Sequence, residues 1–234
     1  FRFHAGGLET SAVRLCTALA ARGHAVHVLA EDADLVPEVA VHTEGLAAHA
    51  TILAQTTPDL TIDWGFYHPA DVHRLGGGTH RGFLRYQLDA YGGLRRWLKR
   101  LSYRGLKHHR LMARERALLR QPAARFVANS QLTATLAIAD GATPTHVTVR
   151  HNGVDTRHFH PDRCLDQRPA LRARWGLEPT AVAFLLVAHN LRLKNLDLLH
   201  RVFARLPADL HARLLVAGKR RPAGGAPWLV YVGQ

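Results

Sequence analysis

Short apolar strands alternate with helices along most of the chain, and this alternation limits the folds that the chain can adopt. Residues 8–20 carry apolar side chains at helical spacing, and a strand-like run at 25–30 follows them. The same order recurs, with strands expected at 39–42, 59–63, 125–129, 147–150, 182–187, 214–217 and 229–232 and helices at 46–54, 131–139 and 196–206. Repeated strand–helix units form parallel sheets that helices cover. The sequence therefore predicts an α/β fold of doubly wound, Rossmann-like domains.

The alternation restarts after a stretch that contains three prolines, which indicates two successive domains. We predict an N-terminal domain over 1–155, a connection over 156–180 and a second, incomplete domain over 181–234. A Gly-Gly turn ordinarily follows a strand, yet only five residues precede Gly6. The last strand has no helix after it, although parallel strands are joined by covering crossovers. We therefore expect a sequence that is cut at both ends and lacks the first strand.

Composition narrows the class of protein. The 234 residues are 47% hydrophobic and 21% charged, which is typical of a globular protein. No run of about 18 apolar residues is present, so no membrane-spanning helix is expected. The two cysteines, Cys16 and Cys164, do not make a disulfide framework, which favours a reducing cytosol.

Most of the positive charge of the chain lies in one segment. Lys and Arg outnumber Asp and Glu by 31 to 18, and residues 81–120 hold twelve basic and two acidic side chains. Apolar and aromatic residues recur there at three- and four-residue steps, which predicts amphipathic helix that Gly92 and Gly93 divide in two. Such a helix suits an anionic membrane surface. The candidate membrane contacts are Arg85, Arg95, Arg96, Trp97, Lys99, Arg100, Arg104 and Lys107.

Two other interpretations of this segment remain open. It can be an ordinary solvated helix that packs on a core through its apolar stripe. Nucleic acid is a weaker candidate partner, because no helix-turn-helix, zinc finger or aromatic RNA-binding pattern accompanies the charge.

Two glycine-rich turns are candidate binding sites. Gly6 and Gly7 open a helix, where backbone N–H groups can approach a phosphate, although a plain turn is the alternative. The loop at 76–78 leads to Thr79 and His80, and a histidine can bind a hydroxyl or carry a proton near neutral pH. A simple loop before a helix is the alternative there. The remaining histidines lack metal-ligand spacing, so no metal is expected.

Several short motifs occur together in one order: Gly6-Gly-x-Glu9, Val127-Ala-Asn-Ser130, Val149-Arg-His-Asn-Gly-Val-Asp155 and Phe159-His-Pro161. In this order they resemble the GT-B retaining glycosyltransferases of family 4. The resemblance implies two Rossmann-like domains, with 1–155 on the acceptor side and 181–234 binding a nucleotide sugar. It also implies sugar transfer that retains the anomeric configuration, with no covalent nucleophile, no metal and no cofactor besides the donor.

The resemblance also implies donor contacts. Residues 187–195 stand where the family has its donor-phosphate turn, and Lys194 matches the lysine of that pattern. His189 replaces the family's arginine, and Arg192 can restore the lost charge. Cations at this position would neutralise the diphosphate leaving group. Together with Gly6 and Gly7 these residues form the expected donor site. Thr79 and His80 lie on the acceptor side, and His80 is also the candidate catalytic residue.

Within the family, the loop ending at His80 and the basic helix after it resemble the bacterial lipopolysaccharide core glucosyltransferases. These enzymes move glucose from UDP-glucose to heptose at the inner face of the cytoplasmic membrane. The resemblance therefore implies a UDP-sugar, a glycolipid acceptor and a cytoplasmic, membrane-peripheral protein.

The chain departs from the family at one point. The second domain of the family carries a Glu-x7-Glu motif, but no glutamate follows Glu178 here. We therefore expect the chain as given to be a poor catalyst. The alternative function is a basic module, binding membrane or nucleic acid, on a degenerate transferase scaffold.

Overall fold

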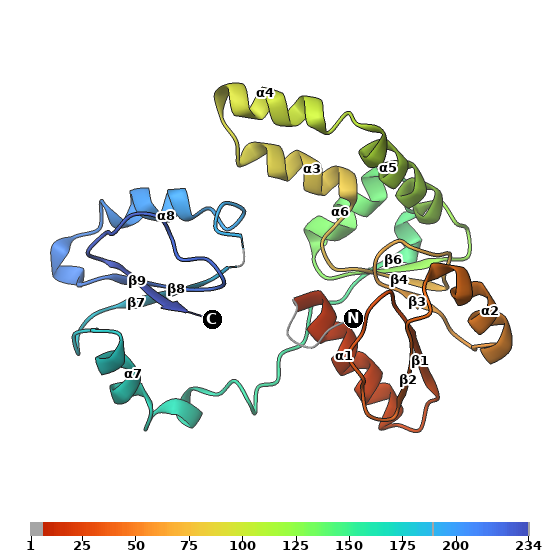
Figure 1. Cartoon of the computed structure of the whole chain (residues 1–234), viewed down its shortest axis with the longest axis horizontal. Coiled ribbons are helices and arrows are strands. Elements are labelled where there is room, and N and C mark those ends of the chain that lie inside the picture. Colours follow the sequence, from red (N-terminus) through yellow and green to blue (C-terminus); the bar gives the residue numbers. More distant parts are fainter. Residues whose placement is uncertain (1–6, 189, 234) are drawn as a thin grey trace. The chain divides into compact units, whose positions relative to one another are not determined.

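The computed structural model describes residues 7–188 and 190–233, which form two compact α/β units (Figure 1). Unit 1 holds the described residues up to Arg85 together with Arg100–Asn152. Unit 2 holds Tyr86–Lys99 and the described residues from Gly153 onward. The strands of each unit pair in parallel, as the sequence predicts.

Unit 1 contains two parallel sheets. β1 (Val26–Leu29) pairs with β2 (Val39–His42), and α1 (Gly7–Ala20) contacts both strands. The larger sheet has the order β3-β4-β5-β6. Its strands span Ile62–Asp63, Val72–Leu75, Arg125–Ala128 and Val147–Val149. Because all four strands run in the same direction, their carboxyl ends lie at one edge of the sheet.

One helix packs directly on the larger sheet and contributes to its core. α6 (Gln131–Ala139) packs on β5 and β6, and α2 (Leu46–Thr56) follows β2 along the chain. Ser130 caps α6 by accepting the backbone N–H of Thr133 at 3.2 Å, as an N-cap serine is expected to do. The buried core consists of Leu75, Leu119, Ala124, Phe126, Ala128, Ala134, Ala137 and Ala142.

Unit 2 contains a three-stranded sheet in the order β7-β8-β9. Its strands span Ala183–Val187, Arg213–Ala217 and Leu229–Gly233, and its helices are α7 (Arg168–Arg174) and α8 (Leu196–Phe203). Buried side chains of α8 and β8 form its core. In β7, Leu185 and Val187 stay 65% and 64% exposed, so the described residues leave part of this strand uncovered.

The basic segment forms three helices, where two pieces are predicted. These are α3 (His80–Asp89), α4 (Gly93–Ser102) and α5 (Leu106–Leu119). The predicted break at Gly92 and Gly93 is confirmed. A second break at Gly105 is not predicted; this residue has extended backbone and precedes α5, which agrees with the low helix propensity of glycine.

Sequence patterns also missed β4 and α7. The sequence of β4 is Val-His-Arg-Leu, whose polar centre hides the strand. His73 is only 1% exposed there, because its ring stacks between Phe66 and Phe126 and its Nδ1 lies 3.1 Å from Asp63 Oδ2. α7 and a short 3₁₀ turn at Pro161–Cys164 lie within the predicted connection. In the described part of the chain, no helix has the length and apolarity to cross a membrane.

Candidate functional site

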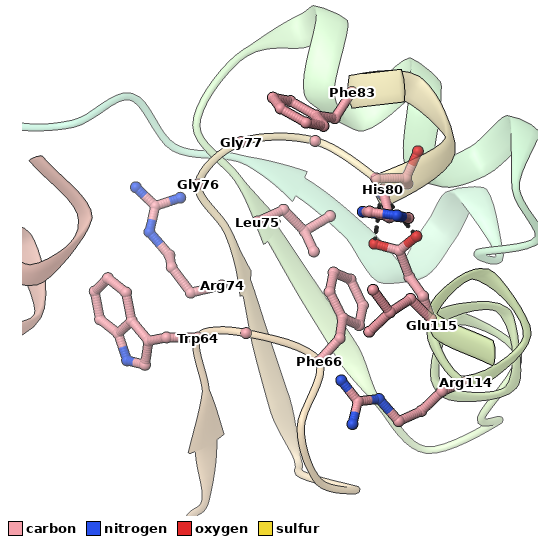
Figure 2. A pocket seen from close by; sticks show the side chains of 14 residues that line it. Trp64, Phe66, Arg74, Leu75, Gly76, Gly77, His80, Phe83, Arg114 and Glu115 are labelled. Carbon is pink, nitrogen blue, oxygen red and sulfur yellow. Dashed lines mark hydrogen bonds between the residues drawn. The ribbon is translucent and has the colours of Figure 1, made fainter. Parts of the chain in front are cut away.

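A pocket of about 270 Å³ lies in unit 1, where the carboxyl ends of β3 and β4 meet α3 and α5 (Figure 2). Open parallel sheets bind their ligands at this edge. The loop at 76–78 forms part of its wall, and its first carbonyl, of Gly76, accepts Nδ2 of Asn129 at 2.6 Å. The lining residues are Trp64, Gly65, Phe66, Arg74, Leu75, Gly76, Gly77, Gly78, Thr79, His80, Phe83, Leu111, Arg114 and Glu115.

Thr79, which the sequence places on the acceptor side, is 1% exposed and anchors the start of α3. Its Oγ1 donates to Oδ2 of Asp140 at 2.6 Å and accepts the backbone N–H of Gly82 at 3.1 Å. Asp140 in turn pairs with Arg81 at 3.2 Å. The hydroxyl of Thr79 therefore holds the pocket wall in place, which is a role that the glycine-loop pattern does not reveal.

His80, the candidate catalytic residue, lines the same pocket as the first residue of α3. Its Nε2 lies 2.9 Å from Nδ1 of His108, and the two rings stack with centroids 5.2 Å apart. Burial lowers the pKa of His80, and His108 and Lys107 lower it further. A neutral imidazole that shares Nε2 with His108 keeps Nδ1 for a hydrogen bond to a bound hydroxyl group.

Glu115 on α5 holds the N-terminus of α3. It is 7% exposed, and its Oε1 and Oε2 accept the backbone N–H of His80 at 2.9 and 2.8 Å. Burial, with a smaller contribution from Asp140, raises the pKa of Glu115 to about 7, against the opposing effects of the His80 N–H and Arg114. Sequence analysis missed this residue; its one signal is that it is an acid within a strongly basic segment.

Arg74 is a second residue that the sequence did not single out. It is half-buried in β4 and lines the pocket, where burial lowers the pKa of its guanidinium. Its Nη1 donates to the carbonyl of Val127 at 3.0 Å, and its Nη2 donates to Oδ1 of Asn152. Its position just before the glycine loop indicates a place at the binding edge of the sheet, but only once β4 is recognised as a strand.

The expected donor residues belong to both units. Gly7 begins α1 in unit 1, and an added Cβ there would meet open space. Arg192 and Lys194 are exposed in the loop between β7 and α8 of unit 2, where the guanidinium of Arg192 lies 5.0 Å from the centroid of the Tyr91 ring. Gly6 and His189 lie outside the described residues. The assignment of all five to a donor site stays a prediction.

All eight candidate membrane contacts are exposed. Four of the basic ones and Trp97 lie on α4, which has no buried residue. Its Leu94, Trp97 and Leu98 are 71%, 57% and 52% exposed, so the apolar face of this amphipathic helix is not packed into either core. Arg96 pairs with Asp89 at 3.0 Å, and the ammonium of Lys99 lies 5.7 Å from the centroid of the Tyr91 ring.

Metal ligands do not converge in the described ranges. No three side chains of His, Cys, Asp or Glu within residues 7–188 and 190–233 are placed to hold a metal ion.

Comparison with curated proteins gives a partial match. No family model matches the chain. Two D-inositol 3-phosphate glycosyltransferases, from Mycobacterium sp. strains KMS and MCS, are each 36% identical to it over 95 residues. The matched region is 40% of this chain and 20% of each relative, so the chain spans about a fifth of their length.

Solved structures match nearly the whole chain. WaaG, a glycosyltransferase involved in lipopolysaccharide biosynthesis, aligns with a TM-score of 0.74 and 17% identity over 95% of this chain and 63% of its own. The structure of Anabaena Alr3699/HepE in complex with UDP and glucose aligns with a TM-score of 0.51 and 15% identity, over 91% of this chain and 58% of its own. Its complex with UDP-glucose aligns with a TM-score of 0.52 and 16% identity, over 91% of this chain and 57% of its own. The chain thus has the fold of GT-B glycosyltransferases, which confirms the predicted fold and the resemblance. Membership in family 4 stays a prediction.

Proposed function

We propose that the protein transfers a sugar from a nucleotide-sugar donor to a hydroxyl group of an acceptor and retains the anomeric configuration. The proposal rests on the pocket that His80 lines at the carboxyl edge of the larger sheet of unit 1. The chain that holds this pocket has the GT-B fold. In this proposal the predicted domain 1–155 supplies the acceptor site and residues 181–234 supply the donor site, with 156–180 as the connection.

The proposed chemistry needs little from the protein besides position and charge. The acceptor oxygen bonds to the anomeric carbon, the bond from that carbon to the diphosphate oxygen breaks, and the acceptor proton passes to the departing phosphate. Arg192 and Lys194 stabilise the charge that develops on the diphosphate, with help from Gly6, Gly7 and His189. His80 hydrogen-bonds the sugar hydroxyls through Nδ1 and orients them.

The finer assignments follow the sequence resemblance. The donor is a UDP-sugar, and UDP-glucose is the first to test because the HepE structures contain UDP and glucose or UDP-glucose. The acceptor is a lipopolysaccharide-core or similar membrane glycolipid, in keeping with the process named for WaaG. The exposed basic and apolar faces of α4 hold the protein at the inner face of the cytoplasmic membrane.

A transfer assay tests the proposal. The protein that carries this sequence is incubated with labelled UDP-glucose and heptose-terminated lipopolysaccharide core, and labelled product is counted. His80→Ala is expected to lower turnover about 100-fold, whereas His24→Ala, an exposed histidine of the same unit, leaves it unchanged. Product of the inverted configuration contradicts the retaining assignment. Absence of transfer from UDP-, ADP- and GDP-glucose alike overturns the proposed activity.

One observation favours a second candidate function, a basic membrane-binding module without catalysis. α4 exposes both its basic and its apolar face, and this arrangement binds anionic lipid whether or not transfer occurs. Binding to anionic vesicles combined with a complete lack of transfer would favour this second function. Nucleic acid is tested as a competitor in the same binding assay.

A further inference from the structure

The guanidinium of Arg74 is a pocket feature that the proposed transfer does not use. It is held by two acceptors, Val127 O on the neighbouring strand β5 and Asn152 Oδ1 three residues after the end of β6. Together with its place in β4, these two contacts fix its position at the carboxyl edge of the sheet. A long side chain that is fixed in this way is already ordered before a ligand arrives.

The charge of Arg74 is not balanced by its neighbours. Both acceptors are neutral, and no carboxylate of the described residues lies within ion-pair distance of its guanidinium. A half-buried cation is ordinarily paired with an anion, because burial weakens its hydration. A guanidinium has five N–H donors, of which these two contacts use two, so donors remain for a ligand.

The other charges of the pocket also favour an anion. Of the residues that line it, only Glu115 is acidic, and both its oxygens are engaged by the N–H of His80. Arg114 adds a second guanidinium, which lies 5.3 Å from the centroid of the Tyr67 ring. Figure 2 shows Arg74 and Arg114 well separated across the pocket, so one anionic group meets Arg74 while Arg114 adds to the positive field.

The glycine loop beside Arg74 offers further donors. The backbone N–H groups of Gly77 and Gly78 donate to no acceptor within the described residues. Gly78 has φ +79°, a left-handed conformation that glycine adopts without strain. Successive N–H groups in such a turn form a concave site for anions.

We propose that this pocket binds an acceptor sugar that carries a phosphate ester, and that Arg74 holds the phosphate. The inference rests on the proposed function, because it names the chemical class of the acceptor. A planar guanidinium pairs with two phosphate oxygens, and the loop N–H groups serve the third. The phosphate then anchors one end of the acceptor, and its sugar hydroxyls lie in the remainder of the pocket, which His80 lines.

Calorimetric titration without any nucleotide sugar tests this site. The probes are glucose 6-phosphate, glucuronate, methyl glucoside and inorganic phosphate, and the variants are Arg74→Gln, Arg74→Lys and the control Arg110→Gln. Arg110 is an exposed residue of α5 outside the pocket, so its variant has the same charge change. Glucose 6-phosphate is expected to bind at least about tenfold more tightly than the other probes. Arg74→Gln removes about tenfold or more of that affinity, and Arg110→Gln removes none.

Each other result overturns a defined part of the inference. Equal binding of methyl glucoside or glucuronate excludes a phosphate subsite, and equal binding of inorganic phosphate excludes a sugar-phosphate site. If Arg74→Gln does not fold, as judged by its thermal transition, Arg74→Lys decides. Lysine keeps the charge and loses the paired donors, so unchanged affinity in that variant excludes guanidinium recognition.

The two proposals fail separately. Transfer to neutral acceptors without any preference for phosphorylated ones overturns the phosphate subsite and leaves the proposed function standing. Binding of glucose 6-phosphate through Arg74 in a protein that transfers no sugar contradicts the proposed function alone.

Discussion

Glu115 accepts the backbone N–H of His80 through both carboxylate oxygens, at 2.8 and 2.9 Å. The two residues are 35 positions apart, so the contact joins α5 to the first residue of α3. A carboxylate at a helix N-terminus is favourable both for the free N–H groups and for the helix dipole. This contact positions the residue on which the proposed chemistry depends.

The raised pKa of Glu115 predicts how stability depends on pH. Its folded pKa of about 7 lies above the ordinary 4.5, so the folded state binds more protons between these values and this group's contribution to stability falls as pH rises through them. The loss amounts to about 3.5 kcal/mol at about 1.4 kcal/mol per pKa unit. In denaturant titrations across pH 4–8, Glu115→Gln is expected to lack this decline. The difference in unfolding free energy between the variant and the wild type therefore shifts in favour of the variant as the pH rises.

Glu31→Gln is the matched control, because Glu31 is exposed in unit 1. It is expected to follow the wild-type curve. If Glu115→Gln follows that curve as well, the titration of Glu115 does not govern the stability of the α3–α5 contact.

The His80–His108 contact predicts a pH profile for transfer. Burial lowers the pKa of His80 below its ordinary 6.5, and His108 and Lys107 lower it further, so neutral His80 persists below that pH. The acid limb of kcat/KM is expected below pH 6.5 in wild type and at higher pH in His108→Asn, which removes one neighbour that lowers the pKa. An acid limb that does not move would remove His108 from control of His80.

Lys194 is expected to matter for transfer and little for folding. It is exposed in the loop before α8, so Lys194→Ala changes the unfolding free energy by less than about 0.5 kcal/mol. Loss of a cation beside the leaving diphosphate lowers kcat/KM about 100-fold. Lys219→Ala, at another exposed lysine of unit 2, serves as the control. Equal effects of the two substitutions on turnover would place Lys194 outside the donor site.

Charge removal on α4 is expected to abolish binding to anionic vesicles. Replacing Arg95, Arg96, Lys99 and Arg100 by Gln removes about 1 kcal/mol of membrane-binding free energy per residue at low salt. For the four residues together this lowers the partition coefficient about 10³-fold. The control replaces four exposed basic residues of unit 2, namely Arg201, Arg205, Arg220 and Arg221. Co-sedimentation with anionic and neutral vesicles, at low and high salt, measures the difference. Equal loss in both variants would mean that net charge, and not α4, drives binding.

Local patterns predicted the elements whose signals are local. α6 and β2 form over the predicted residues, since Ser130 caps the helix and a short apolar run with two valines favours the strand. β4 was missed because its centre is polar, and His73 becomes a core residue only through Phe66, Phe126 and Asp63. Those partners come from other strands or loops, so no pattern within β4 reveals them.

The candidate site divides in the same way. The glycine loop and His80 were identifiable, because a flexible turn that ends on a histidine is visible in four or five consecutive residues. Glu115 and Arg74 were not, because their roles depend on contacts with residues 35 and 53 positions away. The eight membrane candidates were identified from charge, but the lack of any buried residue in α4 is a property of the folded chain.

Most of the strands and helices, the basic segment and the motifs that resemble GT-B glycosyltransferases follow from the amino-acid sequence, since periodicity, turns and short motifs are properties of neighbouring residues. Three properties depend on the folded arrangement: Thr79 is an anchor, Glu115 is buried with a raised pKa, and Arg74 lines a pocket without a balancing carboxylate among the described residues. Burial and charge balance depend on which distant segments pack together, and that information arises only when the chain folds.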